Sequence, residues 1–200
     1  MKYLFVVIFI LFCSGAKAQF LKKNAIYLSN SALIGNYFGL SSSLNYIHKE
    51  NFMIEVGVMG LAKRPMDRPA DYNGGLLNAL TFGIATPRNY VNSFQFLFGK
   101  SINLTPEGNQ RINLKAGPTW SSTHRPHNWQ RVSGSGLIAG NYSYEYLDGR
   151  GLGLIVRPTF EMPFTQVLGF GVGTYFHFHR HSVNAGIELN VMIGSMRLKR

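Results

Sequence analysis

Apolar and polar residues alternate with a period of two over most of the chain after its first twenty residues. Such alternation is typical of β-strands, whose successive side chains point to opposite faces, whereas a helix would mix the two sets. The clearest stretch runs from Arg111 to Trp120. Its apolar face would carry Ile112, Leu114, Ala116, Pro118 and Trp120. Its other face would carry Arg111, Asn113, Lys115, Gly117 and Thr119.

Three further stretches, 93–104, 151–161 and 182–193, repeat this separation. In each, large aliphatic and aromatic residues fill one face, while the other face is mostly Gly, Ser, Asn and isolated charges. Lys100 is an exception on the apolar face. Alternation of this kind also occurs in a sandwich with one face in water. A soluble barrel would place its large apolar residues inside, so the pattern favours strands that turn them outward to lipid.

Eight strands fit this pattern and connect in a regular way. The predicted ranges are 24–32, 36–48, 51–62, 91–104, 110–121, 150–162, 165–178 and 181–194. Tight links alternate with longer ones, the longest being 63–90 and 122–149, as in outer-membrane barrels with short periplasmic turns and longer outer loops. We therefore predict an all-β fold: a single antiparallel up-and-down transmembrane β-barrel of about eight strands. The apolar segment 76–85 is assigned to the first long loop, as a plug, a short helix or an extension of the wall.

The first eighteen residues are organised as a secretory signal peptide. Lys2 precedes an apolar run from Leu4 to Cys13, and Ala16-Lys17-Ala18 fits a small-x-small cleavage site. The run is too short for a membrane-spanning helix, which needs ~20 residues. The predicted domains are thus a signal peptide, 1–18, and an outer-membrane barrel domain, 19–200. The single cysteine leaves with the signal, so the exported part can form no disulfide.

The chain is strongly basic, so anionic partners are expected. Its formal net charge of +11 falls to +9 when Lys2 and Lys17 are cleaved off. Export separates the protein from nucleic acid, so lipid headgroups and lipopolysaccharide phosphates are the expected counter-charges. Contacts with lipopolysaccharide are predicted for bases of the two long loops, Arg64, Arg68, Arg125 and Arg131. The alternative is that these charges only keep the loops soluble. No cofactor or metal is expected, and the protein is expected to be a monomer.

Charged residues also fall on the inward face of the predicted strands. They are Glu55, Arg111, Lys115, Arg157, Glu161 and Glu188. Unpaired charges inside a narrow barrel would cost several kcal/mol per ion, so we expect them to pair and to fill the lumen. A small selective pore lined by the same charges is the alternative. Eight strands leave room for side chains but little room for a channel.

Two groups of residues could carry other chemistry. The first has a spacing of two, which would suit a metal site or a general base: His177, His179 and His181. These residues fall where the last outer turn is expected, so the favoured interpretation is a solvated hairpin tip. The second would suit a lipid-modifying enzyme near the outer interface: Ser121, Ser122, His124 and His127. Solvated loop residues are the favoured interpretation here too, and no catalytic residue is assigned.

Four features carry a resemblance that extends over nearly the whole chain. They are Ala16-Lys17-Ala18 before Gln19-Phe20, the hairpin from Leu44-Asn45-Tyr46 to Val56-Gly57-Val58, the loop Asn128-Trp129-Gln130, and the segment 157–163. In these the chain resembles small outer-membrane β-barrels common in Bacteroidota, and distantly the eight-stranded transmembrane barrels of enterobacteria. The resemblance implies a fold and a location but hardly any activity. Many such barrels end on an aromatic residue, whereas this chain ends with Lys199 and Arg200.

The expected function is therefore that of an integral outer-membrane protein with a structural or surface-interaction role. Three alternatives stay open: a lipid-A-modifying enzyme, a soluble periplasmic lipocalin-like carrier, and a small pore.

Overall fold

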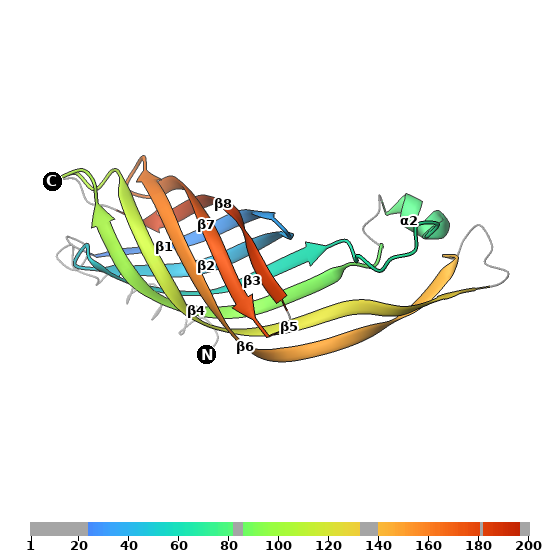
Figure 1. Ribbon diagram of the computed structural model, residues 1–200. Helices are drawn as coiled ribbons and strands as arrows, with labels where there is room; N and C mark the ends of the chain where they lie inside the picture. Colours follow the sequence, from blue (N-terminus) through green and yellow to red (C-terminus); the bar gives the residue numbers. More distant parts are fainter. Residues whose placement is uncertain (1–23, 82–85, 133–139, 181, 197–200) are drawn as a thin grey trace, which may run out of the picture.

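Eight antiparallel strands close into one barrel, in the order in which they occur in the sequence (Figure 1). The computed structural model describes residues 24–81, 86–132, 140–180 and 182–196. The strands are β1 (Ala25–Gly35), β2 (Phe38–His48), β3 (Phe52–Lys63), β4 (Asn89–Asn103), β5 (Arg111–Arg131), β6 (Tyr142–Pro163), β7 (Leu168–His179) and β8 (Ser182–Ser195). The predicted eight-stranded up-and-down barrel is confirmed. The predicted signal peptide, 1–18, lies outside the described residues.

The strands are tilted because their register is staggered around the barrel. From Leu152 on β6, paired residues lead through β5 and β4 to Val58 on β3, and on to Asn30 on β1. From Asn30 they lead through β8 and β7 back to β6 at Met162, not at Leu152. Such a stagger is the geometric condition for closing a sheet into a barrel. Because β1 also pairs with β8, the barrel wall has no unpaired edge.

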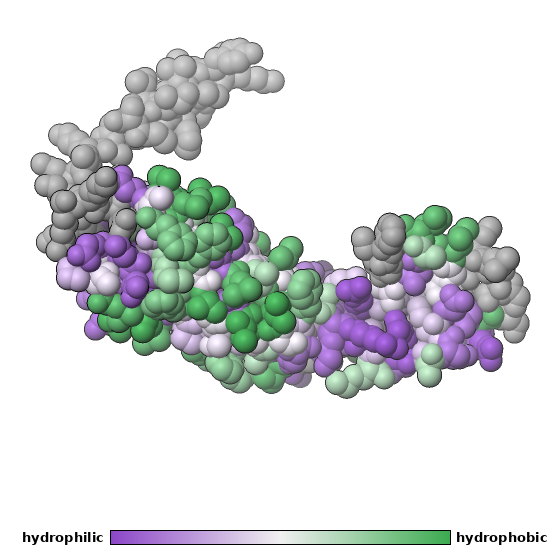
Figure 2. Space-filling view, turned by 90° about the horizontal axis from the view of Figure 1, so that it is seen from above, coloured by the Kyte–Doolittle hydropathy of each residue, from purple (hydrophilic) through white to green (hydrophobic). Residues whose placement is uncertain are grey.

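The two faces of the wall differ in chemistry as the sequence predicted. Leu114 is 50% exposed on the outside, whereas its neighbour Asn113 is fully buried inside. The same alternation holds along β8, where Ile187 is exposed and Glu188 is buried. Hydrophobic residues gather over the barrel in Figure 2, and hydrophilic residues lie on either side of them. In the part of the chain that the structure covers, no helix is long and apolar enough to cross a membrane.

The inside of the barrel also holds large apolar side chains, which the sequence pattern did not predict. One cluster comprises Leu33, Tyr37, Met59, Leu61, Val91, Leu97, Ile155 and Tyr175. A second cluster comprises Ala25, Tyr27, Ile47, Met53, Met192 and Met196. A narrow barrel has to be filled from wall to wall, and flexible methionines suit an irregular space. The lumen therefore consists of apolar clusters as well as polar groups.

The prediction that 122–149 is a loop is wrong for most of its described residues, 122–131 and 142–149. β5 continues to Arg131 and β6 begins at Tyr142, and the two pair as a ribbon that projects beyond the barrel (Figure 1). We call this ribbon, residues 125–131 and 142–148, the arm. The pairing has a bulge between His127 and Gln130, where Asn128 has a positive φ of 55°. The arm escaped the sequence pattern because neither of its faces belongs to the barrel interior.

The connection between β3 and β4 lies beside the arm and contains a short helix. This helix, α2 (Gly75–Leu80), accounts for the first part of the segment 76–85. The remainder of that segment, 82–85, lies outside the described residues. A helix was one of the three possibilities left open by the sequence. Segment 66–74, which precedes α2, contacts the arm, and we call it the clamp loop.

Candidate functional site

All six charged residues predicted for the lumen lie inside the barrel, where they form two groups. The first group joins four strands: Glu55 on β3, Lys115 on β5, Arg157 on β6 and Glu188 on β8. The second joins Arg111 on β5 to Glu161 on β6. Each side chain is there because it occupies an inward position of its strand.

Glu55 is the centre of the larger group. Lys115 Nζ donates to its Oε2 at 2.6 Å, and Arg157 Nη1 donates to its Oε1 at 2.8 Å. Gln95 bridges the same partners, because it accepts from Arg157 at 3.2 Å and donates to Glu55 at 3.1 Å. Glu55 and Arg157 are only 0% and 2% exposed. One carboxylate thus receives two cations in a site from which water is excluded, and this is the arrangement that a buried charge requires.

Glu188 on β8 adds a second carboxylate to this group. Its Oε2 lies 3.3 Å from Arg157 Nε, as an ion pair without hydrogen-bond geometry. Gly173 on β7 makes room for it, because a Cβ added there would lie 3.0 Å from Glu188 Oε1 and 2.6 Å from the Pro158 carbonyl oxygen. Two carboxylates and two cations therefore face one another across the lumen.

The smaller group lies beside Met196, the last residue that the structure describes. Arg111 Nε donates to Glu161 Oε2 at 2.8 Å, and the Tyr27 hydroxyl donates to the same carboxylate at 2.9 Å. The guanidinium also lies over the Tyr27 ring, at 4.9 Å from its centroid. Arg111 Nη1 donates to the Met196 carbonyl oxygen at 3.3 Å. This group ties β1, β5, β6 and the segment after β8 together.

The favoured interpretation of His177 and His179 as a solvated hairpin tip is wrong. Both lie on β7 and point into the lumen, where His177 is fully buried. Its Nε2 lies 3.0 Å from Thr119 Oγ1 and 3.3 Å from Ser121 Oγ. The turn to β8 is so short that the period of two continues to His179. His181 lies outside the described residues.

The four residues considered for a lipid-modifying enzyme are not brought together. Ser121 is buried in the lumen, whereas Ser122 faces outward. His124 pairs with Asp148 at 2.7 Å, and His127 Nε2 lies 3.9 Å from Glu145, both on the exposed arm side of the barrel. Among the described residues, no group of three or more His, Cys, Asp or Glu side chains could hold a metal ion.

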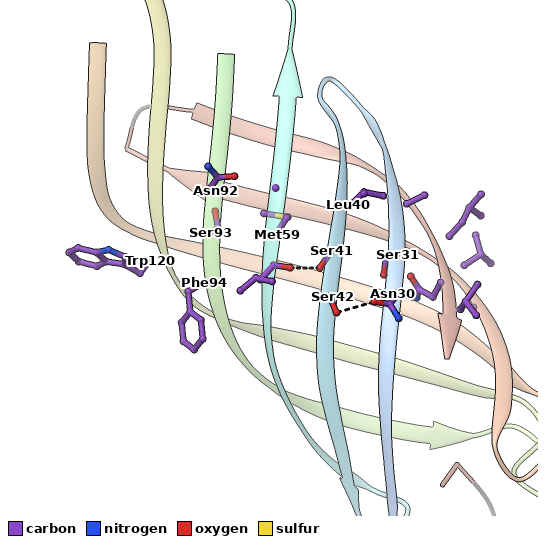
Figure 3. A pocket seen from close by; sticks show the side chains of 18 of the residues that line it. Asn30, Ser31, Leu40, Ser41, Ser42, Met59, Asn92, Ser93, Phe94 and Trp120 are labelled. Carbon is purple, nitrogen blue, oxygen red and sulfur yellow. Dashed lines mark hydrogen bonds between the residues drawn. The ribbon is translucent and has the colours of Figure 1, made fainter. Parts of the chain in front are cut away.

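The outward face of the first five strands carries a hydrogen-bonded polar pair inside its apolar surroundings. Figure 3 shows Asn30 beside Ser42, with Phe94 and Trp120 further along the same wall. Ser42 Oγ donates to Asn30 Oδ1 at 2.9 Å across the β1–β2 pair. A hydrogen bond of this kind reduces the cost of placing polar groups in an apolar medium. The pair is compatible with a wall that faces lipid.

An aromatic cluster joins the arm to the clamp loop. The Tyr72 ring lies 5.5 Å from that of Trp129, which lies 5.0 Å from that of Tyr144. The Tyr142 hydroxyl donates to Asp71 at 2.7 Å, and this hydrogen bond raises the pKa of Tyr142. Partial burial, together with the neighbouring Tyr144, raises the pKa of Tyr146 to about 12. The arm is thus held by contacts that favour neutral tyrosines.

The four bases predicted to contact lipopolysaccharide fall in different places. Arg64 follows β3, and Arg68 lies in the clamp loop with its guanidinium 5.2 Å from the centroid of the Tyr72 ring. Arg125 lies on β5, where the arm begins, and not in a loop. Arg131 is at the far end of the arm and lies 3.8 Å from Asp71. The structure therefore does not bring the four together as one group.

These features define a class of protein: a closed eight-stranded β-barrel with an apolar outer surface, a filled polar lumen and a projecting arm. No protein-family model and no curated protein matches the sequence. Solved structures similar in shape include the N-terminal β-barrel domain of Pseudomonas aeruginosa OprF (9% identity, TM-score 0.48) and Neisserial surface protein A (11%, 0.49). Ail, the attachment invasion locus protein of Yersinia pestis, is another (8%, 0.45). Each match covers 86% of this chain and 95% or 96% of the other.

Proposed function

We propose that this chain is an integral outer-membrane protein whose barrel anchors a surface-exposed arm, with a structural or surface-interaction role. One observation carries the proposal: the barrel is apolar outside and densely filled inside. Lipid requires every backbone polar group of a spanning segment to be satisfied, and a closed barrel does this. Phe94 and Leu154 are exposed on the outside of the barrel, and a lipid bilayer would cover them.

The filled lumen argues for an anchor and against a pore or a carrier. The residues of both charge groups are buried, and the interior also holds two apolar clusters and buried neutral polar side chains such as Gln95, Asn113 and His177. Ion conduction needs a continuous path of water, and a lipocalin-like carrier needs a ligand cavity lined by the inner face. The large apolar side chains on the outside also argue against a water-soluble carrier, because such a surface would aggregate in water. Catalysis is left unassigned, because Ser121 and His177 meet inside the lumen, away from the lipid-facing surface, whereas His124 and His127 pair with Asp148 and Glu145.

The first test is the location of the protein and its behaviour on a gel. We expect the full chain to fractionate with the outer membrane and to migrate differently before and after heating, as folded barrels do. Recovery from the soluble periplasm would contradict the proposal. In planar bilayers the purified barrel is expected to give no steady current, and a reproducible unitary conductance would favour the pore instead.

The finer proposals concern origin and partners. The resemblance to Bacteroidota barrels, the signal peptide and the monomeric state are proposals of this kind. Outer-membrane lipid and lipopolysaccharide are the proposed partners, since at the end of β3 and in the connection to β4 the bases Lys63, Arg64, Arg68 and Arg88 outnumber the acids Asp67 and Asp71.

A further inference from the structure

Two arginines, Arg64 after β3 and Arg88 before β4, lie at the rim of the barrel from which the arm projects. Lys63 pairs with Asn89 as the last residues of the β3–β4 ladder. Arg64 directly follows β3 and Arg88 directly precedes β4, so both lie next to this last pair of the ladder. Burial continues to alternate there, because Pro65 and Pro87 are buried while Arg64 and Arg88 are exposed. Both arginines therefore face outward, on the same face as the apolar wall.

Arg68 of the clamp loop adds a third positive charge to this pair. Partial burial lowers its pKa, and the charges of Arg64 and Arg88 lower it further, which shows that the three guanidinium groups are close. In the described ranges of the chain, no carboxylate lies within ion-pair distance of any of the three. The nearby His124 and Asp148 pair with each other. Three like charges thus repel one another at the rim, and an anion between them would relieve this repulsion.

The position of the three arginines indicates which anion this would be. Tyr90 follows Arg88 by two residues on β4 and pairs with His124, and the outward Phe94 and Trp120 follow toward the middle of the wall. Tyr and Trp are enriched where a membrane meets water. The arginines lie just beyond these aromatic residues, at the level of lipid headgroups. Arginine is also the side chain best suited to a phosphate, because its planar fork can donate two parallel hydrogen bonds.

We propose that Arg64, Arg68 and Arg88 form a binding site for a phosphate group of a membrane glycolipid, held at the outer rim between β3, β4 and the clamp loop. This inference rests on the proposed outer-membrane location and names the residues that would recognise the lipid. Arg131, which the sequence had placed with this group, is excluded from the site because it pairs with Asp71 on the arm.

The test measures binding of bisphosphorylated lipid A to the full-length barrel folded in a phosphate-free alkyl maltoside. Replacing all three residues, as Arg64→Gln, Arg68→Gln and Arg88→Gln, is expected to weaken binding by about tenfold or more, since each exposed charge-assisted contact is modest alone. Binding by the unaltered protein should weaken at high salt, because exposed charges are screened. Lysine at the same three positions should restore part of the affinity, since it keeps the charge but not the fork.

The matched control is Arg131→Gln, which removes one positive charge from the arm and none from the rim. We expect it to leave lipid A binding within twofold of the unaltered protein. A similar loss in this variant would reduce the effect to net charge and overturn the proposal. The same lipid without its phosphates should bind poorly, and equal binding would also overturn the proposal. If millimolar inorganic phosphate displaces lipid A completely, the site is one for free phosphate and the lipid assignment is wrong.

Failure of the site and failure of the location are distinguishable. Fractionation and heat-modifiability report the location and the fold, and the triple glutamine variant should match the unaltered protein in both. An outer-membrane barrel whose lipid A affinity does not change in that variant would leave the proposed function intact and end this inference. A protein found in the soluble periplasm would contradict the proposed function whatever it binds in detergent.

Discussion

Glu55 is the residue on which the buried charge network most depends. It holds Lys115 and Arg157 at 2.6 and 2.8 Å, and it is completely buried. Glu55→Ala would leave two cations in the lumen with one partner fewer, so we expect a loss of about 3–5 kcal/mol in the free energy of unfolding. Urea unfolding of the barrel in lipid vesicles would measure it.

The control for this change is Glu145→Ala on the arm, which also removes a carboxylate near a base. Glu145 is exposed and lies 3.9 Å from His127. A pair of this kind contributes little, so the expected loss is less than ~1 kcal/mol. If both variants unfolded at the same urea concentration, the lumen charges would have no special role in stability.

Depth in the membrane gives a second test with single residues. Leu44 lies at the middle of β2 and faces outward, whereas Leu114 lies near one end of the wall, opposite Lys100. An arginine costs roughly 2–4 kcal/mol at the bilayer midplane and about 0–1 kcal/mol near the interface. Leu44→Arg should therefore destabilise the folded barrel more than Leu114→Arg does. The reverse order in a folding titration would mean that the membrane lies elsewhere on the barrel.

The orientation of single residues was the most predictable property of this sequence. The outward and inward sets of 111–120 and 182–193 follow directly from alternation, because lipid-facing positions must be apolar. The pairing of six inward charges followed from the cost of burying them alone. Their exact partners did not, since strand register depends on long-range closure of the barrel. The interpretation of His177 was wrong because the sequence does not show where β7 ends and the turn to β8 begins, and this position decides whether His177 lies inside the barrel or in the turn.

At the scale of elements, the arm is the part that alternation could not reveal. Period-two patterns arise where one face of a strand is buried, and the arm has no buried lumen face. Pro126 and Asn128 are also residues that favour turns, so the segment looked like a loop. What orders the arm instead is the clamp loop, through Asp71 and the rings of Tyr72, Trp129 and Tyr144. The contacts between the arm and the clamp loop join residues far apart in sequence, 62 positions for Trp129 and Asp67 and 71 positions for Tyr142 and Asp71.

The clamp should open at high pH, well before the barrel unfolds. The raised pKa values of Tyr142 and Tyr146, the latter about 12, mean that the closed arm favours neutral tyrosines. A group whose pKa is raised by folding stabilises the folded form fully when the pH is below the ordinary pKa of that group, which is near 10 for tyrosine. This contribution is lost as the pH rises through the raised pKa. We therefore expect the clamp to loosen between about pH 10 and pH 12.

Fluorescence of Trp129 can follow this opening if the other tryptophan is replaced, as Trp120→Phe. Asp71→Asn should lower the pKa of Tyr142, because it removes the carboxylate that accepts from the tyrosine hydroxyl. The opening should then change its pH dependence. A fluorescence signal that stays constant up to the pH at which the barrel itself unfolds would show that the tyrosines do not hold the arm.

At the scale of the whole molecule, the barrel and the arm are stabilised by different sets of contacts. The barrel is closed by the β1–β8 pairing and filled by two apolar clusters and two charge groups. The outer part of the arm instead contacts the clamp loop, through Trp129, Tyr142 and Arg131. Stability should therefore belong to the barrel, and the arm should contribute little to it.

Removing the arm tests this division directly. His124 and Asp148 are paired across β5 and β6 and lie where the arm begins, so a short Asn-Gly turn can join them in place of 125–147. We expect the shortened protein to fold, to shift on heating as the full chain does, and to unfold within about 1 kcal/mol of it, since exposed ribbons contribute little to a core. Arg64, Arg68 and Arg88 all remain, so its affinity for lipid A should also persist. A shortened protein that fails to fold would show that the arm is part of what closes the barrel. One that folds but loses lipid A would place the recognition of lipid on the arm and not at the rim.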